Sequence, residues 1–387
     1  MPYSRRSFLV ASALGIIGCA RRRVMPFIGR EWHLYVGTYT GETQSRGIYG
    51  LALDRESGAM RSEGLVAVTE SPSFLALAPG GRALYAVNEL TEFEGRPSGG
   101  VTALARDEAT GALSLLGQKA SQGGAPCYVT VDRLGRHVLV ANYVGGSIAV
   151  LPIGAGGAVG EATAVMQHVG RGPHPERQTA PHAHCVILDA TNRFALATDL
   201  GIDRVLIYRF DAGAGTLAPA DEPEVALRPG AGPRHITFSP DGRTLYLLNE
   251  LDSTLVAFAY DADTGRLRER QTLSTRPAGA VGENFPADVH VHPLGHSVYA
   301  SNRGDNTVAV FSVSPDTGRL TLVDSISTGG NWPRNFALDP TGAQLLVANQ
   351  RSNSIVGFRV DPTTGRLTRT GARVELPAPV CLLFTGM

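Results

Sequence analysis

The sequence is poor in cysteine, and the spacing of its four cysteines excludes a disulfide framework. Cys19 lies in the N-terminal segment, and Cys127, Cys185 and Cys381 are far apart. An odd number at unrelated spacings is not the paired pattern of a disulfide-stapled domain. Because each of the three falls in a short apolar stretch, we expect a small buried side chain there, and not a catalytic thiol.

The chain also lacks an excess of either charge and the common cofactor motifs. Lysine plus arginine and aspartate plus glutamate both number 35, so the formal net charge is zero. This balance excludes the broad basic surface of a nucleic-acid-binding protein. The sequence has no P-loop, dinucleotide fingerprint, zinc spacing or Gly-x-Ser-x-Gly elbow. We therefore expect no cofactor and no nucleic-acid partner.

The sequence does contain a repeat of about 50 residues, each unit opened by a proline and a short apolar strand. The prolines follow one another at intervals of 46 to 55 residues and are Pro72, Pro126, Pro181, Pro233, Pro286, Pro333 and Pro379. Self-similarity at this period, built from strands and turns, is typical of a β-propeller. The sequence predicts an all-β, seven-bladed β-propeller with four-stranded antiparallel blades.

The two ends of the chain are expected to share one blade. The last repeat offers only a first strand, 379–384, and the segments 33–38, 47–53 and 65–69 offer the other three. Closing the ring in this way removes its open sheet edges. No linker interrupts 31–387, so we expect a single propeller domain there, in a monomeric protein.

Residues 1–30 are expected to be an export signal and a short linker. SRRSFL at 4–9 matches the twin-arginine pattern, and an apolar stretch follows that is about half the ~20 residues of a membrane span. IIGC at 16–19 resembles a lipobox in which Cys19 is acylated. The alternative is a plain signal peptide with a chance cysteine. We expect a periplasmic protein or an outward-facing lipoprotein that meets the membrane only through this anchor.

A propeller brings polar residues that are scattered in the sequence to one rim of its channel. The first two strands of a blade are antiparallel, so the start of the first lies beside the end of the second. Polar residues concentrate at these positions, whereas the middles of the strands are apolar. The starts carry His182, Arg234, His235, Asp288, Arg334 and Asn335, and the ends carry Asn88, Glu89, Asn142, Asp199, Asn249, Glu250, Asn302, Arg303, Asn349 and Gln350.

Arg234 and Glu250 open and close one such hairpin, so their side chains should lie close together. A carboxylate there activates water if its neighbours shift its pKa towards neutrality. A structural ion pair at a blade corner explains the same pattern. Arg303 and Arg334 add two guanidinium groups at equivalent positions, and three such groups suit an anionic substrate or a developing oxyanion.

His182 and His184 stand two residues apart in an expected strand and should share a face. With Asp199 they could hold a metal, but contact with the substrate is the interpretation we favour, and a structural histidine is the third reading. His290 and His292 repeat the pattern more weakly. Asparagine favours turns, so part of the asparagine pattern at the rim is turn chemistry.

The motifs GAGPRHITFSPDGRTLYLLNELDST, PADVHVHPLGHSVYASNR and WPRNFALDPTGAQLLVANQRSNSI together resemble the seven-bladed lactonase family, as does RQTAPHAH followed by DLGIDRV. This family includes propeller-type 6-phosphogluconolactonases and carboxymuconate-lactonising enzymes. The resemblance covers about 35–386 and implies lactone chemistry at the channel mouth without an obligatory metal. Carried over by motif, the active-site set is His182, Arg234, Glu250 and Arg303. The expected substrate contacts are Arg334, Asn335, His235, His184, Asp199, Asp288, Asn249 and Gln350.

The resemblance and the expected export together favour hydrolysis of a sugar lactone or a related carboxylated lactone. The phosphorylated gluconolactone is a cytoplasmic metabolite that an exported protein would rarely meet. A lactonising lyase of the muconate type stays open, and it would need a proton donor at carbon and carboxylate clamps. A non-catalytic binding or interaction propeller also stays open, because the fold serves many functions.

Overall fold

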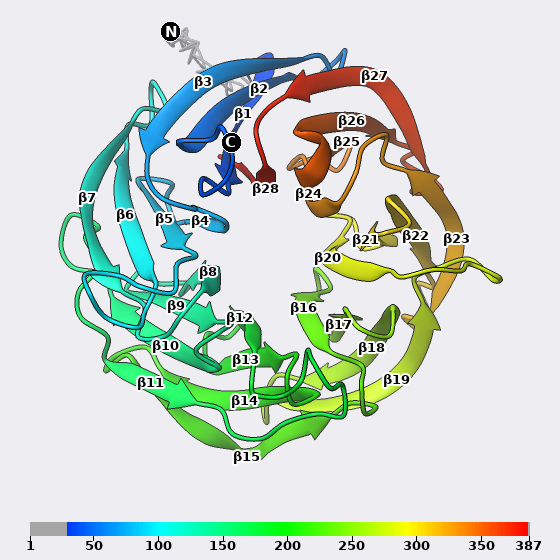
Figure 1. The fold of residues 1–387 in the computed structure, drawn as a ribbon. Coiled ribbons are helices and arrows are strands. Elements are labelled where there is room, and N and C mark those ends of the chain that lie inside the picture. The colour runs from blue at the N-terminus through cyan, green and yellow to red at the C-terminus, as the bar shows by residue number, and fades with distance from the viewer. Residues whose placement is uncertain (1–28, 386–387) are drawn as a thin grey trace, which may run out of the picture.

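The computed structural model describes residues 29–385, and these form one closed ring of seven four-stranded antiparallel sheets (Figure 1). The predicted all-β propeller is confirmed. The expected signal segment and Cys19 lie outside the described residues. Within 29–385, no helix is long and apolar enough to cross a membrane.

Each blade runs from a first strand beside the channel to a fourth strand on the outside. The closing blade consists of β28 (Pro379–Phe384), β1 (Glu31–Thr38), β2 (Gly47–Asp54) and β3 (Met60–Val68). The next two are β4 (Leu75–Leu77), β5 (Ala83–Asn88), β6 (Gly100–Arg106) and β7 (Leu113–Ala120), and β8 (Pro126–Val131), β9 (His137–Asn142), β10 (Ser147–Pro152) and β11 (Ala164–Gln167).

The remaining four blades follow in chain order. They are β12 (Ala183–Leu188), β13 (Phe194–Asp199), β14 (Arg204–Asp211) and β15 (Thr216–Ala226); β16 (Pro233–Phe238), β17 (Thr244–Asn249), β18 (Thr254–Asp261) and β19 (Arg266–Ser274); β20 (Phe285–Val291), β21 (Ser297–Arg303), β22 (Thr307–Val313) and β23 (Leu320–Ser327); and β24 (Pro333–Leu338), β25 (Gln344–Asn349), β26 (Ser354–Val360) and β27 (Leu367–Glu375). A single 3-10 turn, η1 (Gln350–Ser352), follows β25.

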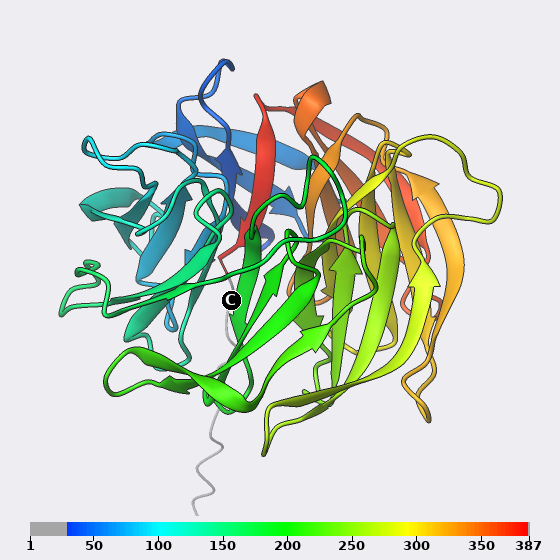
Figure 2. The ribbon, with the colours of Figure 1, turned by 60° about the horizontal axis from the view of Figure 1, so that its bottom comes forward.

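The ring closes as the repeat predicts. Strand β28 pairs with β1 in antiparallel register, with Leu34 opposite Phe384 and Gly37 opposite Cys381. In Figure 2 the red C-terminal strand stands among the blue N-terminal ones. Apolar side chains fill the space between neighbouring sheets; Leu196 of β13, for example, packs with Leu247 of β17. Because every sheet is covered on both faces by its neighbours, the side chains of the strand middles are apolar and buried.

A β-bulge recurs near the start of the first strand in six of the seven blades. In four of them it leaves the residue after the opening proline outside the ladder, namely Cys127, Arg234, Arg334 and Val380. In β12 the skipped residue is His184, and β20 shifts its register between Pro286 and Val289. A bulge turns a side chain away from the alternating pleat. Cys127, Arg234, Arg334 and Val380 all line one small pocket at the centre of the ring.

The three cysteines lie in first strands, as expected. Cys127, Cys185 and Cys381 belong to β8, β12 and β28, and all are buried and free. Burial raises the pKa of the Cys185 and Cys381 thiols to about 12 and that of Cys127 well above its usual value. All three are therefore protonated at neutral pH, which suits apolar packing and not nucleophilic attack.

Candidate functional site

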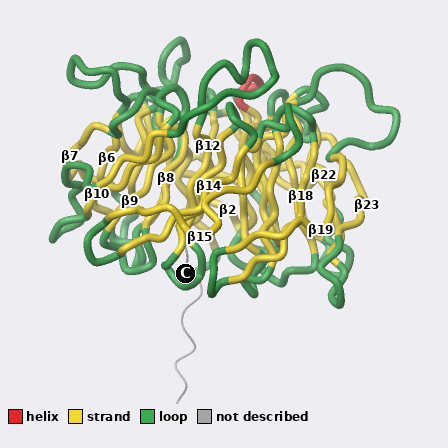
Figure 3. Tube along the Cα trace, turned by 90° about the horizontal axis from the view of Figure 1, so that it is seen from below, coloured by secondary structure: helices red, strands yellow, loops and turns green. Residues whose placement is uncertain are grey.

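The first strands begin and the second strands end on one face of the disc, and we call the opening of the channel on this face the mouth. In Figure 3 this is the upper face, marked by the red turn η1 and by the longer loops. Two of these loops matter for the site. One joins β11 to β12 over 168–182, and the other joins β19 to β20 over 275–284.

Glu250, directly after β17, is the centre of a buried ion cluster at the mouth. Its Oε2 accepts hydrogen bonds from Arg234 Nε at 2.9 Å and from Arg303 Nη2 at 2.6 Å. Its Oε1 accepts one from Arg177 Nη2 at 2.5 Å. Glu250 is only 4% exposed, and Arg234 and Arg303 are buried as well. The expected closeness of Arg234 and Glu250 is therefore present, within a larger cluster.

The cluster sets the protonation state of Glu250. Burial alone would raise the pKa of this carboxyl, but Arg303, Arg234 and Arg177 outweigh burial and hold the pKa well below its usual value. Burial lowers the pKa of Arg303 to about 9, so it remains charged at neutral pH. Glu250 is thus a permanently ionised and weakly basic group. The shift towards neutrality, on which its expected role as a base depended, is absent.

His182 is held at the mouth with one ring nitrogen free. Its Nδ1 lies 2.9 Å from the backbone carbonyl of Tyr143, and the two rings are stacked at 4.5 Å. A carbonyl oxygen only accepts, so Nδ1 carries the proton and Nε2 carries the lone pair in the neutral ring. Nε2 has no hydrogen-bond partner in residues 29–385. Tyr143 also links His182 to the cluster, because its hydroxyl lies 3.3 Å from Arg177 Nη2.

Asp199 lies beneath His182 and has no exposed surface. Its Oδ2 pairs with His168 Nδ1 at 2.7 Å, and its Oδ1 accepts the backbone N–H of His182 at 2.7 Å and that of Gly201 at 2.9 Å. The structure therefore gives Asp199 a position that supports His182. The sequence led us to expect that the Asp199 carboxylate contacts the substrate. In the structure the carboxylate is buried, where a substrate at the mouth cannot touch it.

The three residues considered as metal ligands are not brought together. His182 faces Tyr143, Asp199 faces His168, and His184 packs against Cys127 with its Nδ1 3.7 Å from the Cys127 Sγ. The bulge in β12 leaves His184 outside the ladder, and the rings of His182 and His184 both pack on Tyr143, with centroids 4.5 and 5.5 Å away. Among the residues that the structure describes, no three histidine, cysteine, aspartate or glutamate side chains form a group able to hold a metal.

Asp288, His235 and Asn335 form a second buried cluster below the ion cluster. His235 Nδ1 lies 2.8 Å from Asp288 Oδ1, and Asn335 Nδ2 donates to Asp288 Oδ2 at 2.6 Å. All three are buried, and only the half-buried His290, 3.0 Å from the same Oδ2, reaches towards solvent. Their expected substrate contact would require a ligand below the arginines.

Asn249, also expected to touch the substrate, belongs to the interior of its blade. It is buried and its Nδ2 donates to Thr254 Oγ1 at 2.8 Å. Asn142 and Asn302 close their second strands in the same way and reach backbone carbonyls of the preceding blade, at Ser121 and Thr275. The asparagines at these strand ends are structural links. Gln350, in contrast, is half-buried at η1, and its buried Oε1 has no partner among the described residues.

Arg334 lies in β24, two blades on from Glu250, and has a much looser partner. Its Nη2 is 4.0 Å from Glu89 Oε1, and its guanidinium lies over the Tyr39 ring at 5.2 Å. The Tyr39 hydroxyl in turn binds both oxygens of Glu89 at 2.9 Å. The side chains of Arg334 and Glu89 are 18% and 17% exposed. Arg334 makes no hydrogen bond within 29–385, so its donors are open to a ligand.

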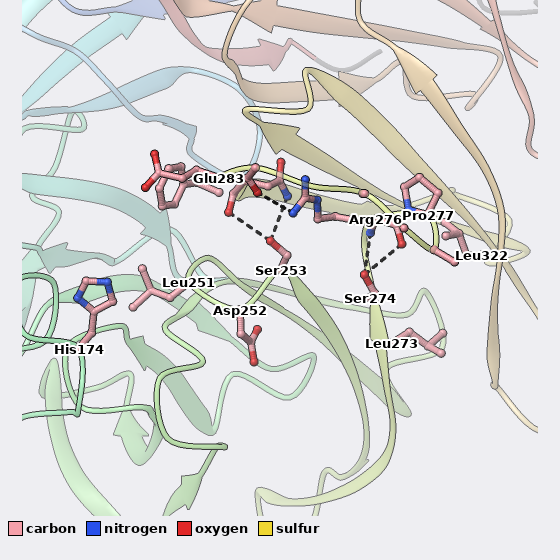
Figure 4. A pocket seen from close by; sticks show the side chains of 16 residues that line it. His174, Leu251, Asp252, Ser253, Leu273, Ser274, Arg276, Pro277, Glu283 and Leu322 are labelled. Atoms are coloured by element: carbon pink, nitrogen blue, oxygen red, sulfur yellow. Dashed lines mark hydrogen bonds between the residues drawn. The ribbon is translucent and has the colours of Figure 1, made fainter.

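A larger pocket of about 790 Å³ adjoins the ion cluster (Figure 4). His174 and Leu251 lie on one side of it, and Arg276 and Pro277, from the loop after β19, lie on the other. Leu251 follows Glu250 in the chain, and the carbonyl of Phe285, another lining residue, accepts from Arg303 Nε at 2.9 Å. The pocket is therefore a space next to the charged cluster, although no side chain of the cluster lines it.

Arg177, Tyr143 and Glu89 contribute to the mouth but were not among the expected site residues. Arg177 lies in the 168–182 loop, which is longer than the corresponding connections between the other blades, so no repeat position marks this residue. The only signals were its place in the motif RQTAPHAH, five residues before His182, and the charge of that loop. Tyr143 and Glu89 directly follow asparagines at strand ends, where the amide pattern drew attention instead.

Comparison with known proteins defines the class of this chain. Residues 33–384 match the family model described as lactonase, 7-bladed beta-propeller. The chain therefore belongs to the seven-bladed β-propeller lactonase family, and the resemblance found in the sequence is confirmed. Its enzyme class is that of a lactone hydrolase.

Within this family, the chain is similar to propellers named 6-phosphogluconolactonase or gluconolactonase. The 6-phosphogluconolactonase of Bacillus subtilis (strain 168) is 36% identical over 294 residues, which is 76% of this chain and 81% of the relative. That of Formosa agariphila is 31% identical and covers 75% of this chain and 81% of the relative. The solved structure of the Pseudomonas aeruginosa periplasmic gluconolactonase PpgL has a TM-score of 0.86 and 36% identity, over 92% of this chain and 99% of that one.

The ion cluster predicts a stability cost for removing its negative charge. Glu250→Gln should destabilise the protein by about 3–5 kcal/mol, because buried guanidinium groups lose their counter-charge. Thermal and urea unfolding followed by circular dichroism measure the change. Glu89→Gln is the matched control, since its looser, more exposed ion pair with Arg334 should be worth about 1 kcal/mol or less. Equal stability of the Glu250 variant and the wild type would contradict the cluster.

Proposed function

We propose that this protein hydrolyses a non-phosphorylated sugar lactone at the mouth, with water activated by a base and the oxyanion stabilised by arginines. The observation that carries the proposal is the pairing of His182, whose Nε2 is free, with guanidinium groups fixed by Glu250. Tyr143 joins the two, since it stacks on His182 and contacts Arg177. A base and a guanidinium group thus both contact Tyr143, and ester hydrolysis requires a base and positive charge near one carbonyl group.

In the proposed reaction, His182 Nε2 takes a proton from water as the oxygen attacks the lactone carbonyl carbon. Negative charge then develops on the carbonyl oxygen. Arg234 Nη2 and Arg303 Nη1, which have no partner among the described residues, are the donors proposed to receive it. The tetrahedral intermediate collapses with cleavage of the ring C–O bond, and the His182 imidazolium returns the proton to the leaving alkoxide. The product is the open hydroxy acid.

Glu250 acts in this scheme as the anchor of the arginines. Its low pKa disfavours proton uptake, and both of its oxygens already accept hydrogen bonds from guanidinium groups. Without the carboxylate, three positive charges would repel one another at the mouth. Glu250 therefore keeps the oxyanion donors in place while it leaves proton transfer to His182.

The charges around the mouth bear on the choice of lactone. The mouth has more positive than negative side chains: four arginines, Arg177, Arg234, Arg303 and Arg334, and two glutamates, Glu250 and Glu89. A neutral lactone that is hydrolysed to an acid anion is therefore surrounded by net positive charge. Glu89, however, lies beside Arg334, whose guanidinium makes no hydrogen bond among the described residues. A carboxylate there accepts hydrogen bonds from sugar hydroxyls and repels a phosphate group. This arrangement supports a non-phosphorylated sugar lactone.

The expected export supports the same substrate, and one solved relative is a periplasmic gluconolactonase. We propose that the protein is exported to the periplasm and anchored by a lipid on Cys19. Strand β1 begins at Glu31 on the face opposite the mouth, so an anchor there would leave the mouth open to solvent. Cys19→Ala should release the protein from membranes in cell fractionation, and unchanged membrane association would contradict acylation at this residue.

The arginines also fit a second reaction, the closure of an unsaturated diacid by a lactonising lyase. In that case the guanidinium groups would clamp the carboxylates, and His182 in its protonated form would donate the proton at carbon. A muconate assayed beside a panel of sugar lactones separates the two reactions. A folded protein that acts on neither would point to a binding propeller.

His182→Asn should lower kcat for lactone hydrolysis by about 10²–10⁴, the contribution of one positioned base. The melting temperature should stay close to that of the wild type, since Nε2 supports no contact. Acid release in a pH-stat measures the rate, and the control is His33→Asn, whose half-exposed ring lies on the face opposite the mouth. Full activity of folded His182→Asn would remove His182 from the mechanism and return the role of base to Glu250.

Glu89→Gln should shift the specificity of the enzyme. Removing the negative charge beside Arg334 should raise kcat/KM for a 6-phosphorylated lactone relative to its non-phosphorylated form by about tenfold, equivalent to about 1.4 kcal/mol. The two lactones are compared in parallel with wild type and variant. An unchanged ratio would show that Glu89 does not select against phosphate.

A further inference from the structure

Four buried polar groups form a continuous line from the channel wall to the mouth. Asp288 Oδ1 lies 2.8 Å from His235 Nδ1, and His235 Nε2 lies 3.0 Å from Arg234 Nη1. Arg234 Nε then donates to Glu250 Oε2 at 2.9 Å. All four residues are buried. His235 and Asp288, the two residues farthest from the mouth, come from different blades, since His235 lies in β16 and Asp288 in β20.

The chemistry of the guanidinium group fixes the protonation state of His235. A guanidinium has only donors, so Nε2 of His235 must accept the hydrogen bond from Arg234. Nδ1 then carries the proton and donates it to Asp288. His235 is therefore neutral and held in one tautomer, and each of its ring nitrogens has a different task.

Asp288 is itself fixed from several directions. Its Oδ1 also accepts the backbone N–H of Val289 at 3.0 Å, and its Oδ2 accepts from Asn335 Nδ2 at 2.6 Å and lies 3.0 Å from His290 Nε2. The His235 ring is enclosed by Tyr128 and His184, both with ring centroids 5.3 Å away. The ring has little freedom, so it transmits the position of Asp288 to Arg234.

We propose that Asp288 and His235 are positioning residues that aim the Arg234 guanidinium at Glu250 and the mouth, and that the site is competent only while His235 is neutral. The inference rests on the proposed function, in which Arg234 stabilises the oxyanion. It assigns these residues a role in holding a catalytic donor, in place of the substrate contact that their sequence positions suggested.

Protonation of His235 at Nε2 would place this N–H against an N–H of Arg234 Nη1, so the hydrogen bond between Arg234 and His235 would be lost. The charged groups facing the ring are Arg234, Asp288 and, through Asp288, His290; His184 is a further titratable neighbour. Burial and Arg234 lower the pKa of His235 to about 4, and burial also holds the pKa of His184 well below its usual value. Asp288 stays ionised, because His290 and His235 outweigh its burial. The activity that depends on neutral His235 is therefore complete well above pH 4 and is lost as the pH falls through about 4.

Two substitutions at His235 separate its two tasks. In His235→Gln, the amide oxygen takes the place of Nε2 and still accepts from Arg234. In His235→Asn, the amide nitrogen takes the place of Nδ1 and still donates to Asp288, but Arg234 Nη1 loses the ring acceptor and keeps only the backbone carbonyl of Ala287. We expect kcat to fall about tenfold or less in the glutamine variant and about 10²–10³-fold in the asparagine variant, the effect of a misplaced oxyanion donor. KM should change little in either, and thermal unfolding confirms that both variants fold.

The pH profile provides the next measurement. Both proteins need the neutral form of His182, the proposed base, so they share that dependence on pH. Below about pH 4, protonation of His235 should lower wild-type kcat by about a further tenfold per pH unit, and the glutamine variant should lack this additional loss. Circular dichroism shows whether the fold persists. Equal losses in the two folded variants, or an identical acid limb in wild type and glutamine variant, would overturn the proposal.

Nitrogen-15 spectra of histidine-labelled wild-type protein test the line without any substrate. The His235 signals, assigned by their absence in the glutamine variant, should show a protonated Nδ1 and an unprotonated Nε2 from pH 7 to pH 5. A protonated Nε2 in this range would overturn the proposal. Wild-type protein that hydrolyses no lactone but shows the expected tautomer would contradict the proposed function and leave the Asp288–His235–Arg234 line intact.

Discussion

The shared carboxylate of Glu250 is the interaction on which the arrangement of the mouth depends. It holds Arg234 from its own blade, Arg303 from the next blade and Arg177 from the loop before β12. Moving such charges out of water is costly unless each is paired and hydrogen-bonded. The cluster can therefore form only when the blades are in their final places, and the closure of the ring by β28 and β1 is what keeps them there.

The bulge near the start of the first strands directs side chains of different chemical types into one small pocket. An ordinary strand would send the residue after the opening proline along the alternating pleat, between the sheets. The extra residue turns it towards the channel instead. The same backbone feature presents a thiol at Cys127, a guanidinium at Arg234 and Arg334, and an apolar side chain at Val380. The site can vary at these positions while the apolar packing between blades is left unchanged.

The sequence was sufficient for the ring, its closure and the pairing of Arg234 with Glu250, because the repeat period and the antiparallel hairpin fix these by geometry alone. It was not sufficient where an irregular contact decides. The bulge in β12 takes His184 out of the strand ladder, and the partner that draws Asp199 inward, His168, lies 31 residues earlier in the chain. The protonation state of Glu250 depends on whether burial or the charge of three arginines has the larger effect. One of these, Arg177, comes from an inter-blade loop that is longer than its counterparts in the repeat.

On the proposed mechanism, the commitment of the arginines to Glu250 also limits how tightly the mouth holds its product. Catalysis requires donors that meet the charge of the transition state better than that of the ground state or the product. Three uncompensated guanidinium groups would clamp the carboxylate of the hydroxy acid as strongly as the oxyanion that precedes it. With Glu250 in place, each arginine offers only its remaining N–H groups, and these are fixed in direction by the carboxylate and, for Arg234, by His235. The negative charge at the centre of the site thus favours the passing intermediate over the acid that must leave.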